Sequence, residues 1–208
     1  MMALNNREYA AVAAIHQAHT AGVTAARMDG GLSAEGRADA MDQNFDGAEN
    51  ALDELYARAN QRDSADGQAA YSKAFGLPPH ADGSTVLSHR DAVDRVSGAS
   101  AAEAARLLDG ALNRGDETMA RAVGERALHM AGPADIGGQW ASVLERFASS
   151  APARQQAVGT LAGQIADRQD TVRMIQERHL RHVRRPVEIQ HGDARARAAA
   201  ARAAGNQA

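Results

Sequence analysis

The chain has 208 residues, a formal net charge of −3 and an aromatic content of only 3%. It contains no cysteine, which excludes disulfides, thiolate zinc sites and thiol catalysis. A core poor in aromatic and β-branched residues must be built from Leu, Met and Ala, which suits closely packed helices better than sheets. The composition therefore predicts an all-α protein of antiparallel helical hairpins with two long amphipathic helices.

The distribution of charge and apolar residues limits the surroundings of the chain. Residues 1–100 carry 14 acidic and 8 basic side chains, whereas residues 178–208 carry 7 arginines and two acidic residues. An acidic front and a basic tail suit self-assembly or a polyanion contact, and a solvated helix end explains them equally well. No apolar run approaches the ~20 residues that span a bilayer, and no signal peptide is recognisable. We expect a soluble protein, in the cytoplasm or in a virion, without membrane contact.

Residues 1–76 are predicted to form an N-terminal helical hairpin region. Asn5 and Glu8 match a capping box, and the first helix is expected to end at Gly30-Gly31. A long amphipathic helix is predicted over 33–62, followed by a shorter helix at 68–75. The long helix carries one of the two most regular apolar stripes of the sequence, with spacings of three and four residues. Its members are Ala38, Met41, Phe45, Ala48, Leu52, Leu55 and Ala59.

The rest of the chain divides into three predicted parts after a linker. Residues 77–87, which contain Pro78-Pro79, have turn composition and no periodicity, so they are predicted to form the linker. Residues 88–150 resemble a block of short helices, and residues 151–186 a single long helix of about 34 residues. Residues 187–208 form a basic Ala/Arg tail that is either a frayed helix or disordered. The apolar stripe of this second long helix comprises Val158, Leu161, Ile165, Val172 and Ile175.

One acidic stretch raises the question of a metal site. Residues 42–54 read DQNFDGAENALDE, and the first six match the opening of an EF-hand loop, D-x-N-x-D-G. The twelfth position is Asp53, whose short side chain makes bidentate binding of Ca²⁺ difficult. The stretch also carries the apolar stripe, which a loop would interrupt. We therefore expect the solvated face of a helix, with a metal-responsive site as an alternative whose ligands would be Asp42, Asn44, Asp46 and Asp53.

Two histidine pairs have a spacing that can hold Zn²⁺. His16 with His19, and His179 with His182, each lie one helical turn apart. Neither pair has a carboxylate within its own motif, so the expected role is a half-buried or helix-contact position. Whether the two pairs meet in space stays open at this level.

Motifs for catalysis are absent from the sequence. It contains no G-x-S-x-G, no phosphate-binding glycine loop and no H-E-x-x-H. We therefore expect no enzymatic activity, no cofactor and no small-molecule substrate. A basic cluster at the end of the second long helix could bind nucleic acid non-specifically, although the helix macrodipole also favours arginines there. The candidate polyanion-binding residues are Arg178, Arg181, Arg184 and Arg185.

The segment LLDGALNRGDETMARAVGERALHMAG contains an alanine-rich core, R-G-D-E-x-x-A-R-A-V, at Arg114–Val123. Within residues 100–132 it resembles a helical hairpin of small all-helical proteins encoded among the virion-assembly genes of actinobacterial phages. The resemblance implies a role in a virion or its assembly, with no catalytic residues.

Together these features predict a structural or assembly protein of a phage head, head–tail junction or scaffold, acting as an oligomer through helix–helix contacts. A nucleic-acid-binding or regulatory module that uses the basic C-terminal region is the alternative. The partners would be other copies of the chain and other assembly proteins. The expected interface residues are Met41, Phe45, Leu52, Leu55, Val158, Leu161, Ile165, Val172 and Ile175.

Overall fold

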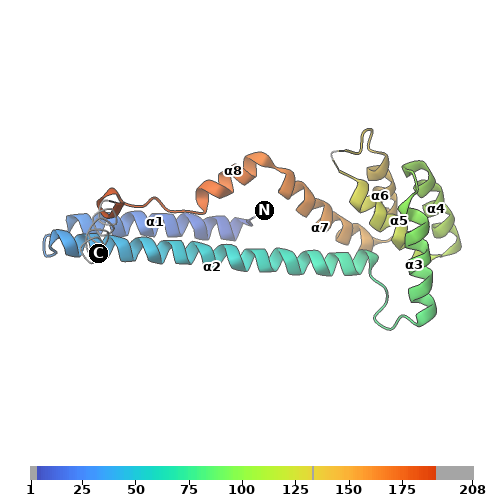
Figure 1. Cartoon of the computed structure of the whole chain (residues 1–208), viewed down its shortest axis with the longest axis horizontal. Helices are drawn as coiled ribbons and strands as arrows, with labels where there is room; N and C mark the ends of the chain where they lie inside the picture. The colour runs from blue at the N-terminus through green and yellow to red at the C-terminus, as the bar shows by residue number, and fades with distance from the viewer. Residues whose placement is uncertain (1–3, 133, 191–208) are drawn as a thin grey trace, which may run out of the picture. The chain divides into compact units, whose positions relative to one another are not determined.

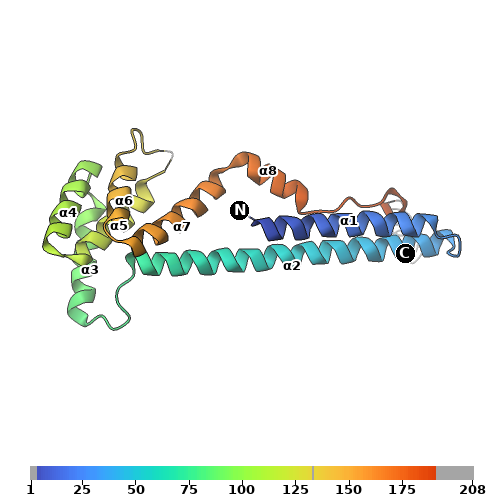
Figure 2. The same cartoon turned by 180° about the vertical axis from the view of Figure 1, so that it is seen from behind.

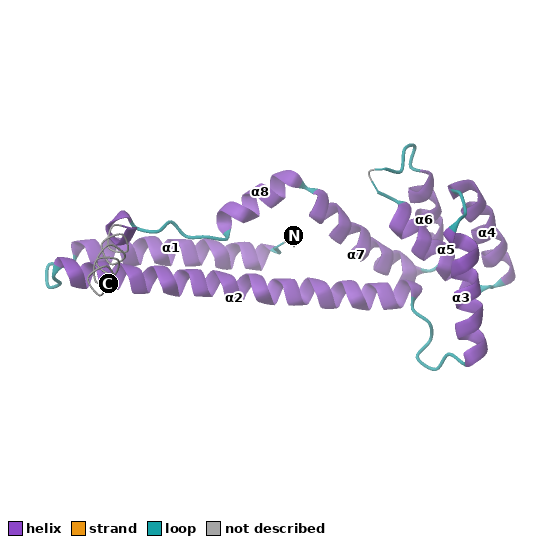
Figure 3. Ribbon diagram, in the orientation of Figure 1, coloured by secondary structure: helices purple, strands orange, loops and turns teal. Residues whose placement is uncertain are grey.

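The computed structural model describes residues 4–132 and 134–190. All described segments are helix or loop, without a strand, which confirms the predicted all-α class (Figure 3). Within the described ranges the helices are α1 (Asn6–Met28), α2 (Ala34–Phe75), α3 (Gly83–Ser97), α4 (Ala101–Arg114), α5 (Glu117–Met130), α6 (Gln139–Ser149), α7 (Pro152–Gln169) and α8 (Thr171–Leu180).

The chain divides into two compact units. The first combines Met1–Arg62 with Asp170–Ala208, and the second is Asp63–Gln169. The first unit is therefore built from both ends of the chain, whereas the second is continuous in sequence. Each unit buries apolar clusters of its own.

Helices α1 and α2 form an antiparallel hairpin in the first unit. Near the start of α1, Glu8 forms an ion pair with Arg62, and further along His19 contacts Asn44, so residue numbers rise in one helix as they fall in the other. The two helices lie side by side in both views of the chain (Figures 1 and 2). They approach closely at Gly22, where a Cβ atom would lie only 2.0 Å from the side-chain Nδ2 of Asn44.

The start of α1 follows the predicted capping box. The Asn5 side chain accepts hydrogen bonds from the backbone amides of Arg7 and Glu8, and the Glu8 carboxylate accepts one from the Asn5 amide. These contacts satisfy backbone donors that the first turn of a helix leaves without intrahelical partners.

The predicted stripe on α2 faces the core of the first unit. Its buried members are Met41, Ala48, Leu52, Leu55 and Ala59, while Ala38 and Phe45 are half-buried. They pack against Val12, Val23 and Ala26 of α1. Residues 42–54 are helical throughout, so the acidic stretch is one side of a helix, as expected, and forms no EF-hand loop.

The third component of this unit is a segment that we call the C-terminal arm, residues 171–190. It begins with α8, continues as an extended segment and ends in a helical turn at 187–190. Val183 and Ile189 are buried, each in a cluster with side chains of α1 and α2. The arm therefore completes both apolar clusters of the hairpin.

A buried carboxylate anchors the start of the arm. Glu177 is only 3% exposed, and its Oε1 accepts hydrogen bonds from the Leu4 amide and the Tyr9 hydroxyl, both at 3.3 Å. Arg173 is its ion-pair partner at 3.4 Å. The Tyr56 hydroxyl donates to the Glu177 carbonyl at 3.3 Å, and burial, followed by the charge of Glu177, raises the pKa of Tyr56 to about 12. A charge this deeply buried is tolerated because it is paired and hydrogen-bonded.

The second unit packs α3 to α7 and the end of α2 around an alanine-rich core. Helix α4 ends at Gly115, whose φ of 69° lies in the left-handed region, and Asp116 caps α5 by accepting the Met119 amide. Phe75 of α2 stacks on Phe147 of α6, with ring centroids 5.5 Å apart. Arg154, which is buried, lies over the Phe147 ring and forms an ion pair with Glu117.

Three predicted boundaries are wrong. Helix α2 is continuous to Phe75, so residues 68–75 are its last part and not a separate helix. The polar stretch between the two predicted helices is also helical, and there the Gln164 side chain donates a hydrogen bond to the Asp63 carbonyl. The linker predicted at 77–87 is shorter, because Asp82 accepts the Thr85 amide and starts α3 at Gly83.

The single helix predicted over 151–186 is also wrong. Helix α7 ends at Gln169 and α8 begins at Thr171, because the Asp170 carboxylate caps α8 by accepting the Arg173 amide. Helix α8 then ends at Leu180, before Pro186. Most of the predicted basic tail, residues 191–208, lies outside the described residues.

Among the helices described, none is both long and apolar enough to cross a membrane.

We predict that Gly47→Ala stabilises the chain by up to about 1 kcal/mol. Gly47 is exposed inside α2 and a Cβ atom there would meet nothing within 4 Å, so alanine only reduces the flexibility of the unfolded chain. Denaturation followed by circular dichroism measures the change. Destabilisation would contradict a helix here and favour a turn of the EF-hand type.

Gly124→Ala is the matched contrast for that experiment. A Cβ atom at Gly124 would lie 2.6 Å from the Phe147 ring in the core of the second unit. The same substitution is therefore expected to destabilise by about 1–3 kcal/mol, because overpacking forces the ring to shift.

Candidate functional site at the C-terminal arm

The C-terminal arm lies against an acidic row on α2. Asp42, Glu49 and Asp53 are spaced by seven and four residues, which places them on one side of the helix. Arg185 forms an ion pair with Asp42 at 3.2 Å, and Arg181 approaches Asp53 at 3.8 Å. The arm therefore runs antiparallel to α2, with its basic side chains opposite the acids.

Glu49 makes the most specific contact of this row. Its Oε1 accepts the backbone amide of Val183 at 2.8 Å, while its Oε2 lies 3.1 Å from Nδ1 of His182. A carboxylate that binds a backbone N–H fixes the position of the segment along the helix, whereas ion pairs between exposed side chains tolerate displacement. Glu49 therefore sets the register of the arm on α2.

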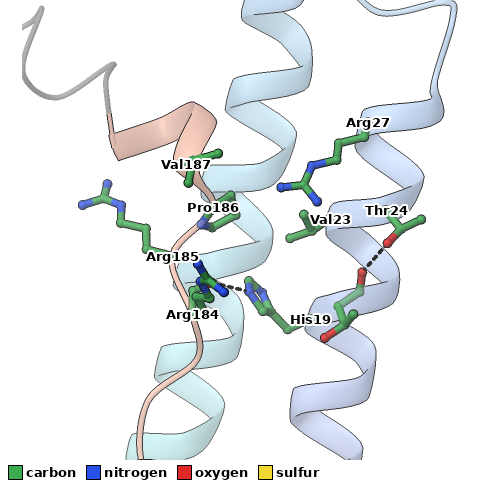
Figure 4. A pocket seen from close by; sticks show the side chains of 9 residues that line it. His19, Val23, Thr24, Arg27, Arg184, Arg185, Pro186 and Val187 are labelled. Atoms are coloured by element: carbon green, nitrogen blue, oxygen red, sulfur yellow. Dashed lines mark hydrogen bonds between the residues drawn. The ribbon is translucent and has the colours of Figure 1, made fainter.

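Helix α1 contacts the other side of the arm through histidines. His16 Nε2 donates to the carbonyl of Leu180 at 2.8 Å, and His19 Nε2 donates to the carbonyl of Arg184 at 3.0 Å. His19 is buried, and its Nδ1 lies 2.7 Å from the side-chain Oδ1 of Asn44 on α2. Figure 4 shows the His19 ring pointing from α1 to the arm at Arg184. One imidazole therefore joins all three segments.

A cavity of about 370 Å³ lies between α1 and the arm (Figure 4). It is lined by His19, Thr20, Val23, Thr24, Arg27, Arg184, Arg185, Pro186 and Val187. The hydroxyls of Thr20 and Thr24 donate to helix carbonyls at 2.9 Å, so neither is activated by a base. The lining is cationic and hydroxylic, which is the chemistry that suits a bound anion.

Arg27, one of the lining residues, forms a two-bond ion pair with Glu188 at the end of the arm. Arg27 donates from Nε and Nη2 to the two Glu188 oxygens at 2.7 and 3.0 Å. This hydrogen bonding lowers the pKa of Glu188 from 4.5 to about 2. Because both side chains are exposed, the pair positions the end of the arm and adds little stability.

The predicted metal ligands do not form a metal site. Asp42 and Asp53 are paired with arginines, Asn44 contacts His19, and Asp46 is exposed. In the part of the chain that the structure describes, no group of three or more His, Asp or Glu side chains is placed to hold a metal ion.

Three of the four histidines in the two pairs contact another segment of the first unit. His16 and His19 both bind the arm, and His182 binds Glu49, while His179 is exposed. The contacts that the sequence did not reveal are the main-chain carbonyls of the arm. Because the arm was predicted to be helical, the carbonyls of Leu180 and Arg184 were not considered as hydrogen-bond acceptors for another segment.

The four predicted polyanion-binding arginines divide into two pairs. Arg181 and Arg185 are engaged by the acids of α2 and lie over the rings of Tyr56 and Phe45, at 5.6 and 5.3 Å from the ring centroids. Arg178 and Arg184 are exposed, and no described carboxylate forms an ion pair with either. Only the second pair is therefore available to another molecule.

The predicted interface residues also divide. Met41, Leu52 and Leu55 are buried within the first unit, Val158 and Leu161 within the second, and Phe45 and Ile165 are half-buried in the same two cores. The remaining two, Val172 and Ile175, are exposed on α8. Most of the predicted helix–helix contacts are thus made inside one chain.

Compared with protein-family models, curated proteins and solved structures, the chain matches none.

The Arg27–Glu188 pair has a testable acid-titration signature. With a folded pKa below the unfolded value of 4.5, the pair contributes fully above that pH and is lost as the pH falls through about 2. The Glu188 carboxyl is therefore expected to remain ionised at pH 3 in an NMR titration. In Arg27→Ala its midpoint should rise toward 4.5, whereas Arg184→Ala, which removes another arginine of the cavity lining, should leave it low. A wild-type midpoint near 4.5 would contradict this geometry.

Proposed function

We propose that the chain is a non-enzymatic structural or assembly protein that works by self-association. The observation that carries this proposal is the orientation of α8. Its inward side holds the charged pair Arg173 and Glu177, whereas Val172 and Ile175 are 67% and 54% exposed. An amphipathic helix normally buries its apolar side, so the outward apolar side of α8 needs a partner.

The cavity and the other exposed apolar residues also support a non-enzymatic role through protein–protein contacts. The cavity beside the arm offers no catalytic pair, and its histidine is occupied by the main chain of the arm. A second exposed apolar group lies on α3, at Val86, Leu87 and Val93. Apolar surface of this kind, rimmed by polar residues, is typical of protein–protein contacts.

A virion or its assembly is the setting that we propose. The support is the resemblance of residues 100–132 to virion-assembly proteins of actinobacterial phages. These residues span α4 and α5, which pack against each other in the second unit. In that setting the chain would contact other assembly proteins as well as its own copies.

Non-specific binding of nucleic acid is a second candidate, favoured by one observation. Arg178 and Arg184 are exposed and have no ion-pair partner among the described carboxylates. If they bind phosphates, affinity for duplex DNA should fall steeply with salt, and Arg178→Ala/Arg184→Ala should reduce the log–log salt slope by about 2. Fluorescence anisotropy measures both quantities, and salt-independent binding or no binding would reject this function.

We expect the purified chain to form oligomers in a concentration-dependent manner, measured by light scattering. Val172→Asp/Ile175→Asp should weaken association on the order of 100-fold or more, because two apolar side chains lose their burial and gain charge. Val86→Asp/Leu87→Asp makes the same change on the second exposed apolar group, on α3, and is expected to weaken association less than the α8 variant does.

Two results would contradict the proposal. One is a wild-type chain that stays monomeric at high concentration and binds no assembly protein. The other is an oligomer that the α8 double variant leaves unchanged, which would assign self-association to a different surface.

A further inference from the structure

The described contacts of the C-terminal arm hold it against the α1–α2 hairpin. Leu180 and Arg184 offer carbonyls to His16 and His19, Val183 donates to Glu49, and Arg185 pairs with Asp42. Val183 and Ile189 supply apolar side chains to the two clusters of the hairpin. The hairpin surface is therefore a docking groove matched in charge, register and apolar positions to one sequence, that of the arm.

The arm is joined to the rest of the chain by one residue. Helix α7 ends at Gln169 and α8 begins at Thr171, so only Asp170 separates them. Its backbone is extended, with φ −75° and ψ 94°, and its carboxylate accepts the Arg173 amide at 3.0 Å. The break therefore depends on a side-chain cap and a single ψ angle.

Nothing else in the local sequence requires this break. No glycine or proline occurs between Gly163 and Pro186, so an uninterrupted helix is sterically allowed across Asp170. In such a helix Ile165, Val172 and Ile175 would be spaced by seven and three residues and would share one side. The two side chains that α8 exposes would then continue the stripe that begins on α7.

We propose that two copies of the chain exchange their C-terminal arms, so that the arm of each copy occupies the docking groove of the other. In the exchanged form α7 and α8 join as one helix through Asp170. Every contact between arm and groove is kept, because the same residues meet across the two chains. This inference rests on the proposed self-association and names the surface and the partner, a second copy of the chain.

The exchange also accounts for the exposed side of α8. In one chain alone, Val172 and Ile175 face solvent while Glu177 and Arg173 face the hairpin. In the exchanged form Val172 and Ile175 of the continuous helix would meet the same two residues of the second copy. The apolar side chains are buried there without disturbing the buried ion pair.

Two substitutions at the junction should shift the exchange in opposite directions. Thr171→Pro suits the observed break, because proline is well accepted as the first residue of a helix and the preceding extended Asp170 is compatible with it. In a continuous helix the same proline would remove a hydrogen bond and clash with the preceding turn. Asp170→Ala instead removes the cap and favours the continuous helix.

The absence of cysteine allows a direct test by crosslinking. Asp53→Cys and Arg181→Cys are introduced in separate full-length chains, since this pair, 3.8 Å apart, is exposed and contributes little to stability. The two chains are mixed, incubated and treated with a short bifunctional thiol reagent. Exchange predicts a covalent heterodimer. Its yield should rise about five-fold with Asp170→Ala and fall ten-fold or more with Thr171→Pro.

The outcomes separate this inference from the function on which it rests. If light scattering shows oligomers but the mixture gives no heterodimer, and a chain with both cysteines crosslinks only within itself, then exchange is overturned while self-association stands. If light scattering shows only monomers, both fail. A heterodimer yield that is the same in Asp170→Ala and Thr171→Pro would also overturn the role of the junction.

Discussion

The structure of the first unit depends on the pairing of an acidic row on α2 with a basic segment more than a hundred residues away in sequence. Asp42, Glu49 and Asp53 would be mutually repulsive on an isolated helix surface, and Arg181 and Arg185 balance two of them. Exposed ion pairs of this kind are individually weak. Their effect comes from acting together with the Glu49 contact to the Val183 amide and with the buried side chains of the arm.

Because of this pairing, the N-terminal hairpin and the C-terminal arm form one folded unit. Without the C-terminal arm, the hairpin of α1 and α2 would expose apolar side chains such as Leu52, which is now fully buried. An isolated pair of helices has no third layer to cover that face, and burial of apolar area dominates the stability of such a unit. Hydrogen bonds then fix the position of the arm. His16 and His19 of α1 bind carbonyls of the arm, and the buried Glu177 of the arm accepts from the Leu4 amide and the Tyr9 hydroxyl. The same groove that completes one chain can accept the arm of another.

Much of the fold could be predicted from periodicity and capping motifs. The stripe from Ala38 to Ala59 identified the buried side of α2, and the Asn5 capping box identified the start of α1. These features are local, so they are visible in a single sequence. The EF-hand-like residues were correctly assigned to a helix because Phe45 and Ala48 were needed by the stripe. What the sequence could not show was that Asp42 and Asp53 face arginines of the same chain.

The failures share a physical origin. The break at Asp170 arises from one carboxylate capturing one amide, a choice that helix propensity alone does not determine. The predicted interface stripe of the second long helix was therefore split, with Val158 and Leu161 buried and Val172 and Ile175 exposed. Two of the predicted polyanion-binding arginines have a different role for a similar reason. Arg181 and Arg185 form ion pairs with Asp53 and Asp42, which are distant in sequence.

Amide hydrogen exchange at Val183 reports whether the arm is docked on α2, because this amide donates to Glu49 outside any helix. We expect slow exchange of Val183 in the wild-type chain and fast exchange in Glu49→Ala, while the buried Val123 of the second unit keeps its protection in both. Exchange of Val183 in the wild-type chain at the rate of an unstructured peptide would contradict the docking of the arm on α2, and with it the groove from which the proposals are built.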